Sequence, residues 1–245
     1  MGLGLGNSLS SPVYLQQTAY AVTRSVDLDG ADDHIIITNS VADDIKNIGS
    51  VSIWFKLENS SGNDTFFNLH TDTSNDNKIA LLHISSTNEI RLNCRGSSSN
   101  TIINADHIPN SSNWVHVVAT WNRTDNKMAI YINGSIAETG TNAIADFATT
   151  ANKIYLGKPG NADNAFFDGK LSSLSLFDAA LSASNVTTLY NSGKPGDVSK
   201  SGISSLVAWL PLDETSGNFI DRTSTGADGV PINIASSDQG VEDTP

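Results

Sequence analysis

Polar and apolar residues alternate along much of this chain, which is the pattern of antiparallel β-strands. The clearest case is residues 113–134, where two β-rich runs flank a polar turn at 123–126. Strand side chains alternate between faces, so each run places its apolar residues in one row. The rows are Val115, Val117, Ala119 and Trp121, then Met128, Ile130 and Ile132. This pattern predicts a hairpin with one face in a core.

Further short runs of this kind are separated by turns rich in Asn, Asp and Gly. They predict strands at residues 50–57, 65–69, 78–84, 89–95, 101–104, 153–157, 166–177 and 206–212. One short helix is expected after Ser182, a good N-cap, and Gly193 would close it. Between them, Val186, Leu189 and Tyr190 recur at helical spacing. Many short strands with turns between them predict an all-β sandwich or barrel.

The ends of the chain differ in character from the middle. We expect a Gly- and Ser-rich arm at residues 1–23, a sandwich over 24–235 and an acidic tail at 236–245. Strand character resumes at 206–230 after a loop. This segment either supplies a closing strand to the same sandwich or docks beside it, because even the roughly 40 residues from 206 to 245 cannot form a second sandwich.

The net charge is −12, from 14 basic and 26 acidic residues. Such a field repels nucleic acid and anionic lipid, so neither is expected as a partner. The N-terminus lacks the features of a signal peptide, and no run approaches the roughly 20 apolar residues of a membrane span. We therefore expect no membrane insertion. Cys94 is the only cysteine and is expected to pack in a strand rather than to react.

A crowded acidic turn contains Asp29, Asp32 and Asp33. Carboxylates are ligands for Ca²⁺, which requires six or more oxygens from several segments, so these three residues are a candidate metal site. The alternative is a turn in which Asp29 accepts backbone N–H bonds. No other cofactor is expected.

Candidate catalytic groups are sparse. Glycosidases of this kind need two carboxylates about 5 Å apart, and no glutamate has an acidic partner at strand spacing except Glu242, which lies in the tail near Asp238. The glutamates are Glu58, Glu89, Glu138, Glu214 and Glu242. The five histidines show no paired metal spacing, and no Gly-x-Ser-x-Gly motif occurs. Four tryptophans could stack on sugar rings if exposed, but core packing is expected for most. An enzyme is therefore not expected.

Six motifs carry a family resemblance. They lie at residues 25–30 (Ser-Val-Asp-Leu-Asp-Gly), 51–56 (Val-Ser-Ile-Trp-Phe-Lys), 114–121, 131–134 (Tyr-Ile-Asn-Gly), 154–157 (Ile-Tyr-Leu-Gly) and 167–171 (Phe-Asp-Gly-Lys-Leu), before the helix. In this order they resemble the concanavalin A-like, laminin G-like jelly-roll superfamily over residues 24–193. The resemblance implies an antiparallel two-sheet jelly roll, one sheet concave.

Two departures from the family pattern stand out. Asn185 replaces the acidic residue that usually follows the helix cap, which weakens a capping box. Residues 209–217, with Asp221 and Gly229 beyond, resemble the segment that normally opens such a domain, yet here they come last.

The arrangement of the ends is similar to virion proteins of tailed bacteriophages. This resemblance implies a non-enzymatic structural protein of the virion, made in the host cytoplasm and displayed on capsid or tail. Its expected partners are copies of itself, other virion proteins and host-surface carbohydrate. The alternative is a free-standing lectin-like module that binds glycan through loops at the rim or through its concave face. A glycoside hydrolase is the third hypothesis.

Overall fold

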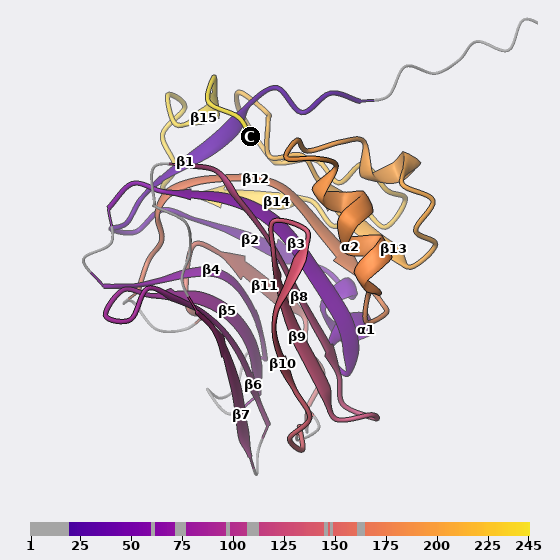
Figure 1. Cartoon of the computed structure of the whole chain (residues 1–245). Coiled ribbons are helices and arrows are strands. Elements are labelled where there is room, and N and C mark those ends of the chain that lie inside the picture. Colours follow the sequence, from indigo (N-terminus) through magenta and orange to yellow (C-terminus); the bar gives the residue numbers. More distant parts are fainter. Residues whose placement is uncertain are drawn as a thin grey trace, which may run out of the picture.

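The computed structural model describes residues 20–59, 62–71, 77–96, 99–106, 113–144, 147, 149–160 and 165–245. Two antiparallel sheets pack face to face, which confirms the jelly-roll sandwich (Figure 1). Among these residues, no helix is long and apolar enough to cross a membrane.

The first sheet has eight strands in the order β10-β9-β8-β3-β12-β1-β15, with β13 also paired to β12. Its strands are β10 (Ser135–Gly140), β9 (Lys127–Ile132), β8 (Val115–Asn122), β3 (Ile48–Leu57), β12 (Asp168–Phe177), β13 (Leu206–Leu210), β1 (Ser25–Asp29) and β15 (Gln239–Val241).

The second sheet has seven strands in the order β14-β2-β11-β4-β5-β6-β7. Its strands are β14 (Gly229–Ile232), β2 (His34–Thr38), β11 (Lys153–Leu156), β4 (Asn63–His70), β5 (Lys78–Ile84), β6 (Glu89–Arg95) and β7 (Asn100–Ala105).

The hairpin that dominates the sequence pattern is β8 and β9, with Trp121 paired to Met128. Its predicted apolar rows face the core between the sheets, and Trp121 is fully buried there. The Trp121 indole N–H donates to the carbonyl of Ile45, 2.8 Å away. That carbonyl belongs to α1 (Val41–Ile45), a five-residue helix that the pattern does not predict. Cys94 also packs in this core, as expected.

The opposite face of β8 is buried as well, because the helix α2 (Ala183–Tyr190) covers it. Val186 and Leu189 of α2 pack against Val118 of β8 and Trp209 of β13 in a second apolar cluster. Figure 1 shows α2 and the chain that follows it lying over the outer side of the eight-stranded sheet. The structure thus has a second, smaller core outside this sheet.

Ser182 caps α2 as predicted, and the capping box forms despite the departure at Asn185. The Ser182 hydroxyl accepts the N–H of Asn185, and the Asn185 side chain accepts the N–H of Ser182. An amide oxygen thus performs the role that the carboxylate has in the usual motif.

The segment at 206–230 contributes to both sheets of the same sandwich. β13 pairs with β12, and β14 pairs with β2. The Asp221 carboxylate organises the loop between them, since it accepts the N–H groups of Trp209, Thr223 and Ala227. These bonds lower the pKa of Asp221 despite its burial.

Both ends of the described chain pack on the sandwich. Residues 1–19 of the expected arm lie outside the described residues, but the Tyr20 ring packs edge-on against Trp209. Its hydroxyl donates to Asp213. Residues 236–245, expected as an acidic tail, instead include β15, which pairs with β1, and Asp243, which contacts Lys56. With only three residues, β15 is too short for an alternating pattern to identify it as a strand from the sequence.

Candidate functional site

The outer face of the seven-stranded sheet gathers amide, basic and aromatic side chains. Residues that pair directly across antiparallel strands point to the same face, so the register defines rows. Across β11, β4, β5 and β6, one row consists of Tyr155, Asn68, Ala80 and Asn93, and we call it the amide row. The neighbouring row, which we call the basic row, consists of Lys153, His70, Lys78 and Arg95.

The amide row contains buried polar atoms without partners. Asn68 is 1% exposed, and among the described residues neither atom of its amide group has a hydrogen-bond partner. The same holds for the side-chain oxygen of Asn93. Leaving such a group unsatisfied costs about 1–3 kcal/mol, so it calls for a bound water or ligand group.

The basic row brings like charges together. Lys78 and Arg95 are directly paired across β5 and β6. Burial, and then the nearby Arg95 charge, lower the pKa of Lys78. Like charges that face each other directly across two strands are destabilising.

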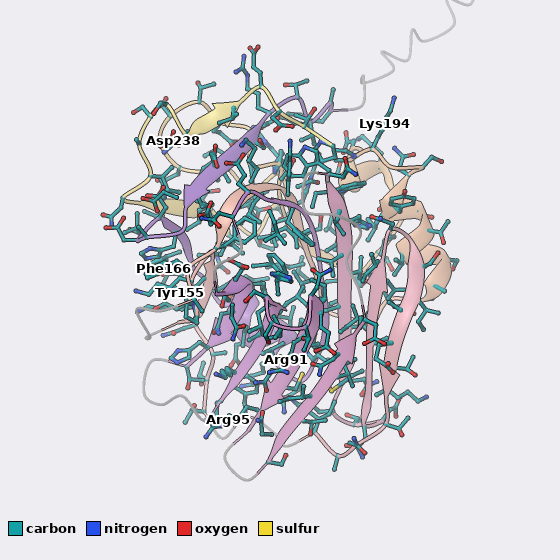
Figure 2. All side chains as sticks on the ribbon, turned by 60° about the vertical axis from the view of Figure 1, so that its left-hand side comes forward. Arg91, Arg95, Tyr155, Phe166, Lys194 and Asp238 are labelled. Carbon is teal, nitrogen blue, oxygen red and sulfur yellow. The ribbon has the colours of Figure 1, made fainter. Side chains whose placement is uncertain are left out.

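Arg91 lies on the same face of β6, beyond Asn93. Its Nε donates to the side-chain oxygen of Asn104 on β7, at 2.9 Å. This bond orients the guanidinium group while leaving its terminal nitrogens available for other acceptors. Figure 2 shows Arg91 and Arg95 on the lower part of this sheet, with Tyr155 and Phe166 nearer its other end.

Aromatic rings gather at that other end. The Tyr155 ring centre lies 6.4 Å from each of His34 and His70. Phe166 lies 6.2 Å from His34, and the Lys158 ammonium is 5.5 Å from the centre of the Phe166 ring. The face therefore offers aromatic surface at one end and hydrogen-bond donors along its length.

None of these side chains was singled out from the sequence. A signal was available in β6, where Arg91, Asn93 and Arg95 alternate with the buried Ile90, Leu92 and Cys94. Alternation identifies residues that share a face, but not which strands lie beside them. To find the amide row and the basic row, one must know the pairing register of β11, β4, β5 and β6.

The predicted acidic cluster does come together. Asp29, Asp32 and Asp33 each offer a ligand atom within 4.8 Å of the others. One oxygen of Asp29 accepts the N–H groups of Ala31, Asp32 and Asp33, which is the turn anticipated as the alternative. Burial and the Asp29 charge raise the pKa of Asp33 to about 6. The carboxylates present can contribute to a Ca²⁺ site, although their own oxygens alone fall short of a full coordination shell.

Ser52 and His116 form a contact that resembles part of a catalytic pair. The hydroxyl lies 2.8 Å from His116 Nε2. The imidazole, however, is 1% exposed, packs against the rings of both Trp54 and Tyr190, and has its pKa lowered by burial to about 3. The pair lies beneath α2, where a substrate has no access, and we assign it a structural role.

The tryptophans and the remaining histidines do not come together in one site. Trp54, Trp121 and Trp209 are buried, as expected, while Trp114 is half-buried and donates to Asp243. His34 and His70 lie on the outer face of the seven-stranded sheet, His83 contacts Asp64, and His107 is outside the described residues.

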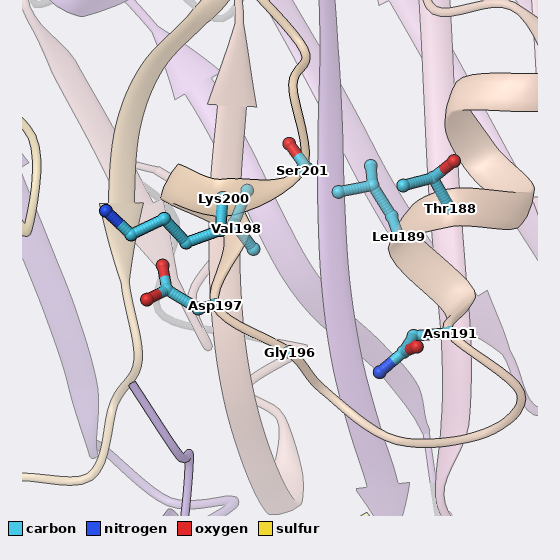
Figure 3. Close-up of a pocket in the computed structure, with 8 residues that line it drawn as sticks. All are labelled: Thr188, Leu189, Asn191, Gly196, Asp197, Val198, Lys200 and Ser201. Atoms are coloured by element: carbon cyan, nitrogen blue, oxygen red, sulfur yellow. The ribbon is translucent and has the colours of Figure 1, made fainter. Parts of the chain in front are cut away.

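Clefts also lie elsewhere on the molecule, including an open one of about 560 Å³ beside Asn133 and Tyr190, and two more are of interest for their lining. One, of about 230 Å³, lies between α2 and the 3₁₀ helix η1 (Val198–Lys200), and Figure 3 shows Asp197 and Lys200 on its one side. The Asp197 carboxylate already accepts the N–H groups of Tyr20 and Ser199. A more apolar cleft of about 340 Å³ lies beside β9 and β10. Neither of these two clefts gathers amide and basic side chains as the amide row and the basic row do.

Solved structures with the same fold include several binding proteins. A heptameric SAP-like pentraxin from Limulus polyphemus aligns with a TM-score of 0.57 at 19% identity, over 77% of this chain and 93% of that one. The CBM40 module of Ruminococcus gnavus IT-sialidase, solved with α2,3-sialyllactose, aligns with 0.57 at 12%, over 70% and 100%. Botulinum neurotoxin type C, whose cell entry depends on two ganglioside molecules, aligns with 0.52 at 21%, over 69% and 42%.

At these identities the structural likeness establishes the fold alone. No curated protein sequence matches the chain. A family model described as the concanavalin A-like lectin/glucanases superfamily matches residues 29–187, which is more than half of the chain. On this match, which agrees with the two-sheet architecture and the motif order, the chain belongs to the concanavalin A-like lectin/glucanase superfamily.

Proposed function

We propose that this chain is a lectin-like module that binds glycan on the outer face of the seven-stranded sheet. The observation that carries the proposal is the amide oxygen of Asn93, which has no partner among the described residues and is flanked on β6 by Arg91 and Arg95. Sugar hydroxyls both donate and accept hydrogen bonds, and amide and guanidinium groups match them in both directions. The ring of Phe166 supplies an apolar surface at one end.

The structural neighbours support this proposal. The CBM40 module is solved with a sialylated sugar, and the neurotoxin interacts with gangliosides. Glycan binding is therefore compatible with this architecture, although the site on this chain is argued from its own residues.

We test the proposal by glycan-array binding of the purified chain. The Asn93→Ala variant removes the amide, and Lys194→Ala serves as control because Lys194 is exposed on the far side, beyond α2 (Figure 2). We expect array signals that disappear in Asn93→Ala and persist in Lys194→Ala. Equal signals from both variants would move the site away from this face, and an array without signals would reject the proposal.

We also propose that binding occurs without turnover. Every charged side chain in the amide and basic rows is basic, whereas glycoside hydrolysis requires a pair of carboxylates. Incubating the bound glycans with the protein and assaying newly formed reducing ends tests this. Release of sugar above that of a heat-denatured sample would contradict it.

The finer proposal is that the module is displayed on a bacteriophage particle, as a homo-oligomer among other virion proteins. Its support is the similarity of the chain ends to virion proteins. Immunogold labelling and mass spectrometry of purified particles test the location. Absence of the chain from particles would leave the free-standing lectin-like module.

A further inference from the structure

We propose that the chain has a second sugar-binding site, for one uncharged sugar unit, in the open cleft between the β9–β10 turn and the C-terminal end of α2. The cleft has a volume of about 560 Å³. It lies on the outer side of the eight-stranded sheet, where Figure 1 shows α2, and so on the opposite side of the sandwich from the amide row. This second site does not depend on glycan binding at the seven-stranded sheet.

The first support is the chemistry of the residues that line the cleft. The β9–β10 turn contributes Asn133 and Ser135, and the end of α2 contributes Tyr190, Asn191 and Ser192 together with two threonines. Every residue that lines the cleft is uncharged, although the chain has 14 basic and 26 acidic residues. Hydroxyl and amide groups around an aromatic ring can bind a hydroxyl-rich ligand without any charge. The volume lies within the range of about 300–1,000 Å³ that is usual for small-molecule sites.

The second support is the orientation of two asparagines on facing walls. The side-chain oxygen of Asn133 accepts the backbone N–H of His116 at 3.0 Å, so its NH₂ group is the end that remains for a ligand. Asn191 is oriented the other way, because its NH₂ group donates to the Lys194 carbonyl at 3.2 Å and its oxygen remains. One wall thus offers a donor and the other an acceptor. A sugar hydroxyl can use both, since it accepts and donates.

The end of α2 selects against an acidic ligand. The last carbonyl groups of a helix have no partner within it and carry a partial negative charge. Thr187, Thr188 and Tyr190 belong to this last turn and line the cleft, and the turn contains no basic side chain. Hydroxyl donors suit such an end, whereas a carboxylate or sulfate would be repelled. We therefore assign the cleft to a neutral sugar.

The Tyr190 ring is held in place at the cleft. Its centre lies 6.0 Å from that of His116 and 5.8 Å from that of Trp54, and in both pairs the rings are stacked. Gly134 brings the turn against this ring, because a Cβ atom there would lie 2.8 Å from Tyr190 Cδ1. The two walls are thus fixed relative to each other before a ligand binds. A preorganised site does not lose free energy in ordering its walls.

Both walls also contain left-handed backbone. Asn133 (φ 49°) and Gly134 (φ 80°) form the two-residue hairpin turn, and Asn191 (φ 46°) and Ser192 (φ 58°) follow α2. Asparagine and glycine tolerate this conformation, so Ser192 is the unusual residue. Strained backbone is concentrated at sites that bind ligands, which agrees with the assignment of this cleft.

The experiment follows backbone amide signals of the isotope-labelled whole chain by NMR. The neutral probes are methyl α-mannoside, methyl β-galactoside and methyl N-acetyl-β-glucosaminide, and N-acetylneuraminic acid is the acidic probe. Each is titrated to about 50 mM, since an open site for one sugar unit should have a Kd of about 1 mM. We expect at least one neutral probe to give saturable shifts at Asn133, Ser135 and Asn191. The acidic probe should bind there at least about threefold more weakly.

Two matched variants add the same ring to the exposed side of α2. Thr187→Tyr places it in the cleft, whereas Ala183→Tyr places it one turn earlier, outside the lining residues. We expect Thr187→Tyr to abolish the sugar-dependent shifts and Ala183→Tyr to keep them. Tyr190→Phe removes only the hydroxyl and should weaken binding about threefold to tenfold. Thermal unfolding checks that each variant is folded.

The Asn93→Ala variant separates the two proposed sites. Shifts at the cleft should be the same in this variant as in the native chain, because Asn93 lies on the opposite sheet. Sugar-dependent shifts confined to β6 would overturn the second site and keep the proposed function, and shifts confined to the cleft would do the reverse. The absence of shifts at the cleft with every neutral probe would overturn the second site, as would shifts that persist in Thr187→Tyr.

Discussion

The outer faces of the two sheets are covered to different extents, although both are built from strands with similar alternation. Part of the outer face of the seven-stranded sheet is buried as well, at Asn68 and His70. On the eight-stranded sheet, α2, η1 and the chain around Tyr20 and Val22 cover the outer side chains, so His116 and Trp209 become almost fully buried. On the seven-stranded sheet, Arg91, Asn93 and Arg95 stay partly exposed. The covering elements, more than the strand pattern, decide which face can bind a ligand.

The largest expected effect tests whether the covered face is a genuine second core. Trp209 is 1% exposed, and its indole N–H donates to Ser173. We expect Trp209→Ala to lower the free energy of unfolding by about 3–5 kcal/mol, as for other large buried aromatic residues. Urea denaturation measures the loss.

The matched variant is Phe166→Ala on the open face, where the ring is only partly buried. Its loss should be less than half that of Trp209→Ala, because less apolar surface leaves water on folding. Equal losses of unfolding free energy in the two variants would mean that both outer faces are covered to the same extent, and would contradict the difference drawn between them.

The next effect concerns pH, and it comes from His116. Burial lowers its pKa to about 3 in the folded protein, from about 6.5 in the unfolded chain. The stability contributed by the neutral imidazole is therefore complete above pH 6.5. It is lost as pH falls toward 3, by about 1.4 kcal/mol per unit at most.

Unfolding free energies at pH 4.5 to 7.5 check this. The His116→Gln variant cannot take up this proton, so its curve should be flatter than that of the native chain, whatever its stability at pH 7. Parallel curves would show that His116 titrates normally and that the cover over this face is open to water.

The strands and the core could be predicted from the sequence better than the candidate site could. The rows of Val117, Trp121 and Met128 were readable because burial on one face of a strand leaves a period-two pattern. The five-residue α1 could not be predicted from the sequence pattern, since it is too short to show a helical period. The cover over His116 is not visible in the sequence, because α2, which provides it, is more than sixty residues away along the chain.

The candidate site shows the same limit. Asn68, Asn93 and Tyr155 become neighbours only through the register of strands from different hairpins. Asp29, Asp32 and Asp33 were found from sequence because they share one turn. Proximity along the chain is visible in a sequence, whereas proximity across a sheet is not.

That acidic turn lies apart from the basic row, and its predicted Ca²⁺ binding is expected to have a smaller effect. Extracellular-type Ca²⁺ sites have dissociation constants of about 10⁻⁴–10⁻³ M, so 5 mM Ca²⁺ should add about 1–2 kcal/mol. We expect a rise in Tm of a few degrees that EDTA reverses and that Asp33→Asn abolishes. An unchanged Tm would leave the cluster as a turn held by Asp29.

The smallest effect on stability is expected for a substitution of Arg91. It tests most directly whether side chains on the outer face of the seven-stranded sheet serve binding rather than packing. Arg91 is half-exposed and bonded to Asn104, so Arg91→Ala should change the free energy of unfolding by about 0.5 kcal/mol or less. Glycan affinity should nevertheless fall, since a side chain kept on an open face contributes to binding rather than to packing. Thermal unfolding and calorimetry on the same sample separate the two quantities. A large loss of stability with unchanged affinity would place Arg91 among the structural residues and make the two faces alike.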